Sequence, residues 1–76
     1  MTTLSREDGP ALWRQIETRL RDEIGRTYPP GTRLPSEADL SRRFGVNRHT
    51  LRRAMDELSR GGLVRVEHGR GAFVPE

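Results

Sequence analysis

The chain has 76 residues, which is enough for one small domain with a limited core. It contains no cysteine, which excludes disulfides and thiolate zinc sites, and no apolar run long enough for a signal peptide or a membrane span, so we expect a cytoplasmic protein. All 14 basic residues are arginine, and eight of them lie with only three acids in residues 42–70, a concentration of positive charge that is typical of proteins that bind a polyanion.

The N-terminal third predicts a flexible arm, a helix and a short strand. Residues 1–9 are polar and are expected to form the arm. From Pro10 onward, apolar residues at three- and four-residue spacing predict a first helix that ends near Gly25. Those residues are Leu12, Trp13, Ile16, Leu20 and Ile24, with Trp13 expected as a core anchor. Residues 32–34 then predict a short extended segment.

Two further helices follow with a very short turn between them. Ser36 predicts the N-cap of the second helix, which ends at Gly45 and is expected to bury Ala38, Leu40 and Phe44. Asn47 predicts the N-cap of the third helix, which covers about residues 47–60. The inward stripe of the third helix is Leu51, Ala54, Met55 and Leu58. This spacing of two helices is typical of a helix-turn-helix motif.

The C-terminal segment predicts a β-hairpin. "LVRVE" and "GAFV" flank the glycine-rich "HGRG" at residues 68–71. Residues 32–34 are expected to pair with this hairpin and complete a three-stranded antiparallel sheet. The predicted fold is therefore an α+β winged helix-turn-helix over residues 10–76, in the order α-β-α-α-β-β.

The outer face of the third helix carries the charge. His49, Arg52, Arg53 and Asp56 face outward, with Arg48 and Thr50 on the flanks of the first turn. Arginines in the N-terminal half oppose the helix dipole, and the pairs Arg52–Asp56 and Arg53–Glu57 are expected to recover a few tenths of a kcal/mol each. Because recognition helices present their N-terminal residues to the major groove, this arrangement predicts a DNA-binding face. Arg48 and Arg52 are the expected readers of guanine.

The hairpin tip is a second expected contact with DNA. Arg70 lies between two glycines and can closely approach a minor groove or the DNA backbone. The candidate DNA-binding residues are Ser36, Arg48, His49, Thr50, Arg52, Arg53, His68, Gly69 and Arg70. No catalytic motif, metal site or cofactor fingerprint is present, so we expect no enzyme activity, no metal and no cofactor.

Three stretches carry a resemblance to a known family: "LWRQI", "PPGTRLPSEADLSRRFGVNRHTLRRAMDELSRGGLV" and "HGRGAFV". The chain resembles the N-terminal DNA-binding domain of GntR-family bacterial transcription regulators, most closely the HutC-like branch and its phosphonate-utilisation regulators. The resemblance implies a dimeric repressor or activator, with a repressor favoured, on a palindromic operator with one half-site per domain. It also implies a C-terminal domain beyond Glu76 that senses a small-molecule effector.

The resemblance also assigns residues. Arg48, His49, Thr50 and Arg52 match the recognition-helix positions that contact bases and phosphates, and residues 68–70 match the wing contacts. Two positions depart from the family pattern. Many relatives have arginine where this chain has Ala38, and threonine or serine where it has Ala72.

Two other functions remain open for this fold. A protein–protein interaction module would present an apolar outer face on the third helix, and an RNA-binding domain would present exposed aromatic rings for stacking.

Without the C-terminal domain, this chain is expected to be a monomer, because one small core uses most of its apolar residues.

Overall fold

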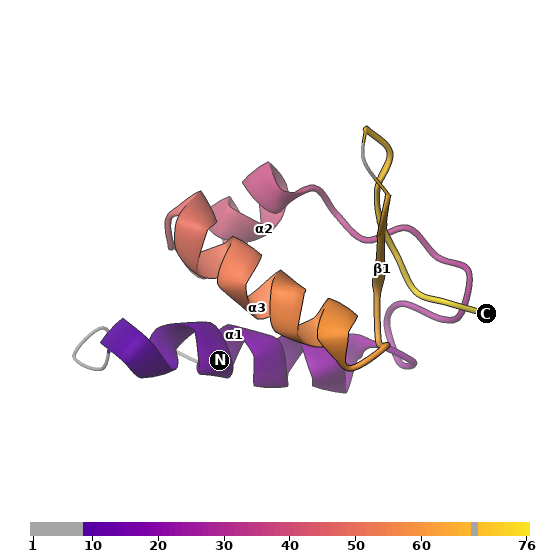
Figure 1. Ribbon diagram of the computed structural model, residues 1–76, viewed down its shortest axis with the longest axis horizontal. Helices are drawn as coiled ribbons and strands as arrows, with labels where there is room; N and C mark the ends of the chain where they lie inside the picture. The colour runs from indigo at the N-terminus through magenta and orange to yellow at the C-terminus, as the bar shows by residue number, and fades with distance from the viewer. Residues whose placement is uncertain (1–8, 68) are drawn as a thin grey trace.

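The computed structural model describes residues 9–67 and 69–76, which form three helices and a hairpin (Figure 1). The elements are α1 (Gly9–Glu23), α2 (Glu37–Phe44), α3 (Arg48–Arg60), β1 (Arg65–Glu67) and β2 (Gly71–Phe73). α3 packs against both α1 and α2, and the hairpin stands beside the C-terminal end of α3 with its tip directed away from α1. The predicted order of helices and hairpin is confirmed. Of the predicted arm, only Gly9 lies within the described residues, and it is the first residue of α1.

The predicted caps define the helix-turn-helix. The Ser36 hydroxyl accepts a hydrogen bond from the backbone N–H of Asp39 at 3.0 Å, and α2 ends at Gly45 with φ of +68°. The Asn47 side-chain oxygen accepts a hydrogen bond from the backbone N–H of Thr50 at 2.8 Å. These side chains satisfy N–H groups that the first turn of a helix leaves unpaired, so they fix where each helix begins.

The core lies between the three helices and the base of the hairpin. Its buried residues are Ile16, Leu20, Leu34, Leu40, Leu51, Ala54, Met55, Leu58, Val64 and Val74. The predicted inward stripe of α3 is therefore confirmed. In α2 the prediction is partly wrong, because Ala38 and Phe44 are only half-buried and Ser41 is buried. Helical spacing places Leu40, Ser41 and Phe44 on one face and Ala38 at its edge.

The hairpin is a two-stranded antiparallel sheet. Its register pairs Arg65 with Phe73, Val66 with Ala72 and Glu67 with Gly71. Gly69 and Gly71 adopt φ of +78° and +107°, a region that L side chains rarely enter. The glycine-rich tip predicted from the sequence is thus a conformational requirement of the hairpin.

The expected third strand does not form within the described residues. Residues 32–34 contact β2 through a single bridge between Arg33 and Phe73. The backbone N–H of Leu34 also donates to the Ala72 carbonyl at 2.8 Å. Prolines stand close on both sides of the segment, and they lack the N–H that a longer ladder needs. The three-stranded sheet is therefore wrong by one strand, although the segment does lie along the hairpin as expected.

Candidate nucleic-acid interface

The N-terminal half of α3 presents its charged face to solvent. Burial of the apolar stripe fixes the rotation of the helix about its axis, so the opposite side must face outward. His49, Arg52, Arg53 and Asp56 are all exposed, as predicted, and Arg48 is exposed at the first turn. The helix therefore displays a basic surface at its N-terminal end.

A groove runs between α3 and the hairpin, and we call it the helix–wing groove. It is lined by residues 33–38 and by Arg48, Arg52, Met55, Asp56, Val66, Glu67, Gly69, Arg70, Gly71 and Ala72. Five predicted site residues from three separate stretches of sequence meet here: Ser36, Arg48, Arg52, Gly69 and Arg70. Packing of the hairpin beside the helix-turn-helix thus brings candidate residues that are far apart in the sequence into one groove.

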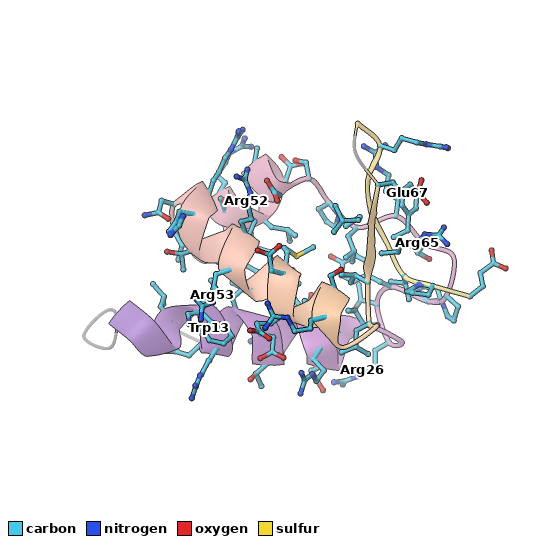
Figure 2. The ribbon with its side chains drawn as sticks, in the orientation of Figure 1. Trp13, Arg26, Arg52, Arg53, Arg65 and Glu67 are labelled. Atoms are coloured by element: carbon cyan, nitrogen blue, oxygen red, sulfur yellow. The ribbon has the colours of Figure 1, made fainter. Side chains whose placement is uncertain are left out.

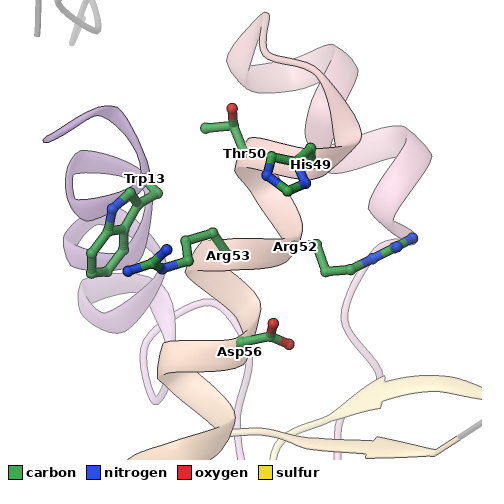
Figure 3. A pocket seen from close by; sticks show the side chains of 6 residues that line it. All are labelled: Trp13, His49, Thr50, Arg52, Arg53 and Asp56. Carbon is green, nitrogen blue, oxygen red and sulfur yellow. The ribbon is translucent and has the colours of Figure 1, made fainter. Parts of the chain in front are cut away.

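A second hollow lies between α1 and α3, and we call it the α1–α3 pocket. Its lining residues are Trp13, His49, Thr50, Arg52, Arg53 and Asp56 (Figure 3). Three further predicted site residues, His49, Thr50 and Arg53, lie here. Arg52 and Asp56 line both hollows, so the two adjoin along α3. The remaining candidate, His68, lies outside the described residues.

Neighbouring helices provide the partners of the two central arginines. Arg53 lies with its guanidinium carbon 4.8 Å from the centre of the Trp13 ring. Arg52 turns the other way and donates from Nη2 to Oε1 of Glu37 at 3.1 Å. Figures 2 and 3 show Arg53 directed toward α1 and Arg52 directed away from it. The hydrogen bond from Arg52 to Glu37 raises the pKa of Arg52 above its ordinary value.

The expected pairs along α3 are therefore wrong. Arg52 pairs with Glu37 rather than with Asp56, and Glu57 pairs with Arg60 at 3.5 Å rather than with Arg53. An i,i+4 pair on an exposed helix is worth only about 0.2–0.5 kcal/mol, so other neighbours can replace it: Glu37 of α2 for Arg52, and Arg60 of α3 itself for Glu57.

Four described arginines have no carboxylate within 4.0 Å among residues 9–67 and 69–76. They are Arg14, Arg33, Arg48 and Arg53, whereas the other nine described arginines each have an acidic partner. Three of the four line the two hollows, Arg33 and Arg48 in the groove and Arg53 in the pocket. Cations without internal partners raise the local potential most, so this surface attracts anions.

The structure adds three residues to this surface that sequence reasoning missed: Trp13, Arg33 and Glu37. Trp13 is half-buried against the core, as a core anchor should be, but its ring also faces Arg53. Arg33 lies across Gly71, so close that a Cβ atom at position 71 would come within 3.0 Å of Arg33 Nε. The predicted pairing of residues 32–34 with the hairpin could have placed Arg33 at this surface. For Trp13 and Glu37 the sequence offered no such indication beyond the residue type.

The wing is also charged, but its arginines are partly compensated. Arg65 pairs with Glu67 at 2.9 Å, and Arg70 approaches the same carboxylate at 3.8 Å. Arg70 keeps 75% of its side chain exposed. It can therefore leave Glu67 for an external anion at little cost, since an exposed pair of this kind is worth about 0–1 kcal/mol.

Other sites are not found in the described part of the chain. No three His, Cys, Asp or Glu side chains in it are grouped so that they could hold a metal ion. None of its helices has both the length and the apolar character that crossing a membrane requires.

Comparison with known proteins identifies the family. A sequence model of the family described as bacterial regulatory proteins, gntR family, matches residues 12–74. The HTH-type transcriptional regulator RB1450 of Rhizobium meliloti is 44% identical over 72 residues, which are 93% of this chain and 30% of that protein. The probable transcriptional regulator PhnF of Escherichia coli is 43% identical over 65 residues, which are 86% of this chain and 27% of that protein. The chain thus spans less than a third of these relatives.

Solved structures agree in fold. The AraR DBD in complex with operator ORE1 superposes with a TM-score of 0.79 at 33% identity, covering 82% of this chain and 77% of that one. A GntR family transcriptional regulator from Listeria monocytogenes superposes with a TM-score of 0.80 at 31% identity, covering 84% of this chain and 57% of that one. The winged helix-turn-helix expected from the sequence is confirmed, and the chain belongs to the GntR family of bacterial regulatory proteins.

Proposed function

We propose that this domain binds double-stranded operator DNA in a sequence-specific manner for a bacterial transcription regulator. In this proposal α3 enters the major groove, and the wing at residues 68–71 contacts the adjacent minor groove or the DNA backbone. Ser36, Arg48, His49, Thr50, Arg52, Arg53, His68, Gly69 and Arg70 are the proposed contacts, and we add Arg33.

One observation carries this proposal. Arg33, Arg48 and Arg53, which have no carboxylate partner among the described residues, line two adjoining hollows along α3. A ligand that meets all three must be an extended anion, because Arg33 and Arg53 come from different hollows. Duplex DNA has this form, with regularly spaced phosphates. The AraR DBD, a structural neighbour, is bound to an operator in its solved structure, which supports the same ligand here.

The two alternatives receive little support. The outer face of α3 is polar, and the exposed large apolar residue of the described chain is Val66, which lies on β1. A protein–protein module would need an apolar patch on α3. Trp13, Tyr28, Phe44 and Phe73 are all half-buried rather than displayed as a row of stacking platforms, which disfavours single-stranded RNA.

The wider proposal concerns the whole regulator. By family, we infer a cytoplasmic homodimer that binds a palindromic operator, one half-site per domain, and acts as a repressor. A small-molecule effector would act through a further C-terminal domain. We infer no catalytic role, and we expect the present chain alone to be a monomer at micromolar concentration in sedimentation equilibrium.

The test of DNA binding starts without a known operator. Selection of bound duplexes from a random pool should yield a consensus half-site, and fluorescence anisotropy then gives affinities for that duplex, a scrambled duplex and single-stranded RNA. We expect the selected duplex to bind most tightly. Equal binding to all three, or binding to none, would refute sequence-specific DNA recognition.

The salt dependence of affinity tests the electrostatic part. Affinity should fall by about 0.9 log units per log unit of salt for each phosphate contacted. Arg53→Ala should lower that slope by roughly one phosphate and weaken all sequences alike. Arg26→Ala is the matched control, because Arg26 pairs with Asp22 at 2.6 Å and lines neither hollow. If the salt dependence of affinity has the same slope for Arg53→Ala as for the control, Arg53 does not contact DNA phosphates.

Arg48→Lys tests base reading. Lysine keeps the charge and loses the planar fork that can bind guanine O6 and N7 together. We expect preference at one base pair to relax by about 1–3 kcal/mol, measured on single-base variants of the selected half-site. An equal loss on every variant would mean that Arg48 contacts only phosphate.

A further inference from the structure

Among the described residues, three acidic side chains line the helix–wing groove, Glu37, Asp56 and Glu67, and of these Glu37 is the one that pairs with Arg52. Glu37 begins α2, lines the helix–wing groove and keeps 38% of its side chain exposed. A carboxylate at this place repels DNA, so it lowers affinity for every duplex. An acid in the first turn does stabilise a helix, but Asp39 in the same turn serves that purpose without facing the groove. The position of Glu37 therefore calls for another explanation.

The contact between Glu37 and Arg52 uses one particular edge of the guanidinium. Arg52 donates from Nη2 to Oε1 at 3.1 Å and from Nε to Oε2 at 3.5 Å. A guanidinium has five N–H donors, so three remain, two on Nη1 and one on Nη2. Two of those three, one on each terminal nitrogen, point from the end of the side chain and can form a parallel pair of bonds. The pair with Glu37 thus holds Arg52 and leaves its end free to bind guanine O6 and N7.

Arg48 and Arg52 differ in this respect. They lie one turn apart on α3, and both line the groove. Arg48 has no carboxylate within 4.0 Å among the described residues, so its fork must be ordered when DNA binds. Arg52 is held before DNA arrives, and fixing a long side chain in advance improves binding in the fixed orientation only.

We propose that Glu37 is a specificity-determining residue that holds the Arg52 guanidinium in the orientation that reads a guanine. This inference rests on the proposed DNA-binding function. Glu37 lowers the affinity for all DNA to a similar extent, because its charge repels phosphates. It raises the difference in affinity between cognate and non-cognate sequences, because it prevents Arg52 from turning toward phosphates. Of this pair, Arg52 contacts the base and Glu37 acts through it.

The experiment measures two quantities, affinity for scrambled duplex and the ratio of affinities for the selected half-site and its single-base variants. Glu37→Gln removes the charge and is nearly the same size, and Glu37→Ala removes the acceptor as well. Each should bind scrambled duplex more tightly than the unmodified protein. Each should also discriminate about three- to tenfold less at one base pair, the factor expected from losing the order of one long side chain.

Asp39→Asn is the matched control. It removes the same charge from the same helical turn, and the partner of Asp39, Arg42 at 3.5 Å, does not line the groove. We expect it to tighten binding to all duplexes slightly and to leave the discrimination ratio unchanged. Circular dichroism melts of all variants check that the fold is retained.

A double-mutant cycle with Arg52→Ala separates the mechanisms. If Glu37 acts through Arg52, Glu37→Gln should no longer change discrimination once Arg52 is absent. A loss of discrimination that persists in that background would mean that Glu37 contacts a base itself, which overturns the positioning role. An unchanged ratio in Glu37→Gln, with wild-type protein still selecting its half-site, overturns the inference alone. Failure of the wild type to bind any duplex overturns the proposed function and the inference with it.

Discussion

Replacement of Glu23 tests how α1 is held against the helix-turn-helix. Glu23 is the last residue of α1, and its side chain is 14% exposed. Its carboxylate accepts hydrogen bonds from both terminal nitrogens of Arg43 at the end of α2, one of them at 2.9 Å, and from Nε of Arg19 at 3.2 Å. The hydrogen bond from Arg43 is the largest of the effects that lower the pKa of Glu23 from its ordinary value of 4.5, and burial opposes it.

The expected magnitude follows from this geometry. A hydrogen bond to a charged group contributes about 1.5–3 kcal/mol when shielded, and an exposed ion pair about 0–1 kcal/mol. Glu23 is largely shielded, while Arg43 keeps 39% of its side chain exposed. We therefore expect Glu23→Gln to lower the free energy of unfolding by about 1–2 kcal/mol, between those two cases. For a domain of this size the melting temperature should fall by roughly 4–16 °C.

Thermal melts followed by circular dichroism provide the measurement, with Glu17→Gln as the control. The Glu17 side chain is 15% exposed and pairs with Arg21 inside α1, so it matches Glu23 in burial but links no second element. Its replacement should cost about 0.2–0.5 kcal/mol. Equal melting temperatures for the two variants would refute the claim that the pair between α1 and α2 is the stronger one.

The same variant has a predicted pH dependence. Because the folded-state pKa of Glu23 is lowered, its contribution to stability is complete above the unfolded value of 4.5 and is lost as the pH falls through the folded value. The difference in stability between wild type and Glu23→Gln should therefore be constant near neutral pH and shrink in acid. A difference that stays the same down to about pH 2, below the usual range of a paired carboxylate, would contradict the assigned cause.

Two further predictions concern the caps and the wing. Asn47→Ala removes the acceptor for the Thr50 N–H and should cost about 1 kcal/mol in urea unfolding, whereas Asn47→Asp should be nearly neutral. Gly71→Ala forces an L side chain to φ of +107° and within 3.0 Å of Arg33 Nε, so it should destabilise the fold by about 1–2 kcal/mol and weaken DNA binding. Gly62→Ala is the control, since it carries φ of +80° with no atom within 4 Å, and an equal loss of DNA binding in both variants would refute a role for the wing base.

Features that depend on near neighbours in the chain could be predicted from the amino-acid sequence. Ser36 and Asn47 cap helices through hydrogen bonds that span only three residues, so the cap positions could be predicted from residue type and spacing. The left-handed turn at Gly45 and the glycine-rich hairpin tip are likewise local. The apolar spacing of α3 then fixed which arginines face outward, and with them the surface predicted to meet DNA.

The partners of Arg43, Arg52 and Arg53 depend on the tertiary structure, whereas the other printed ion pairs join residues two to four apart in the sequence. The i,i+4 rule proposed Asp56 for Arg52, but packing of α2 brought Glu37 within 3.1 Å, from 15 residues away in the sequence. Packing of α1 likewise placed Trp13 over Arg53. Pair energies between exposed charges differ by only tenths of a kcal/mol, so the packing of the helices decides which pair forms. No local pattern in the sequence indicates how the helices pack.

The number of strands was decided in the same way. Residues 32–34 have the composition of a strand and do lie along β2, but the length of the ladder depends on how far two separate segments stay side by side before the chain must turn. Prolines next to the segment end the ladder after one bridge. That geometry brings Arg33 to the wing, where spacing alone had given it no role.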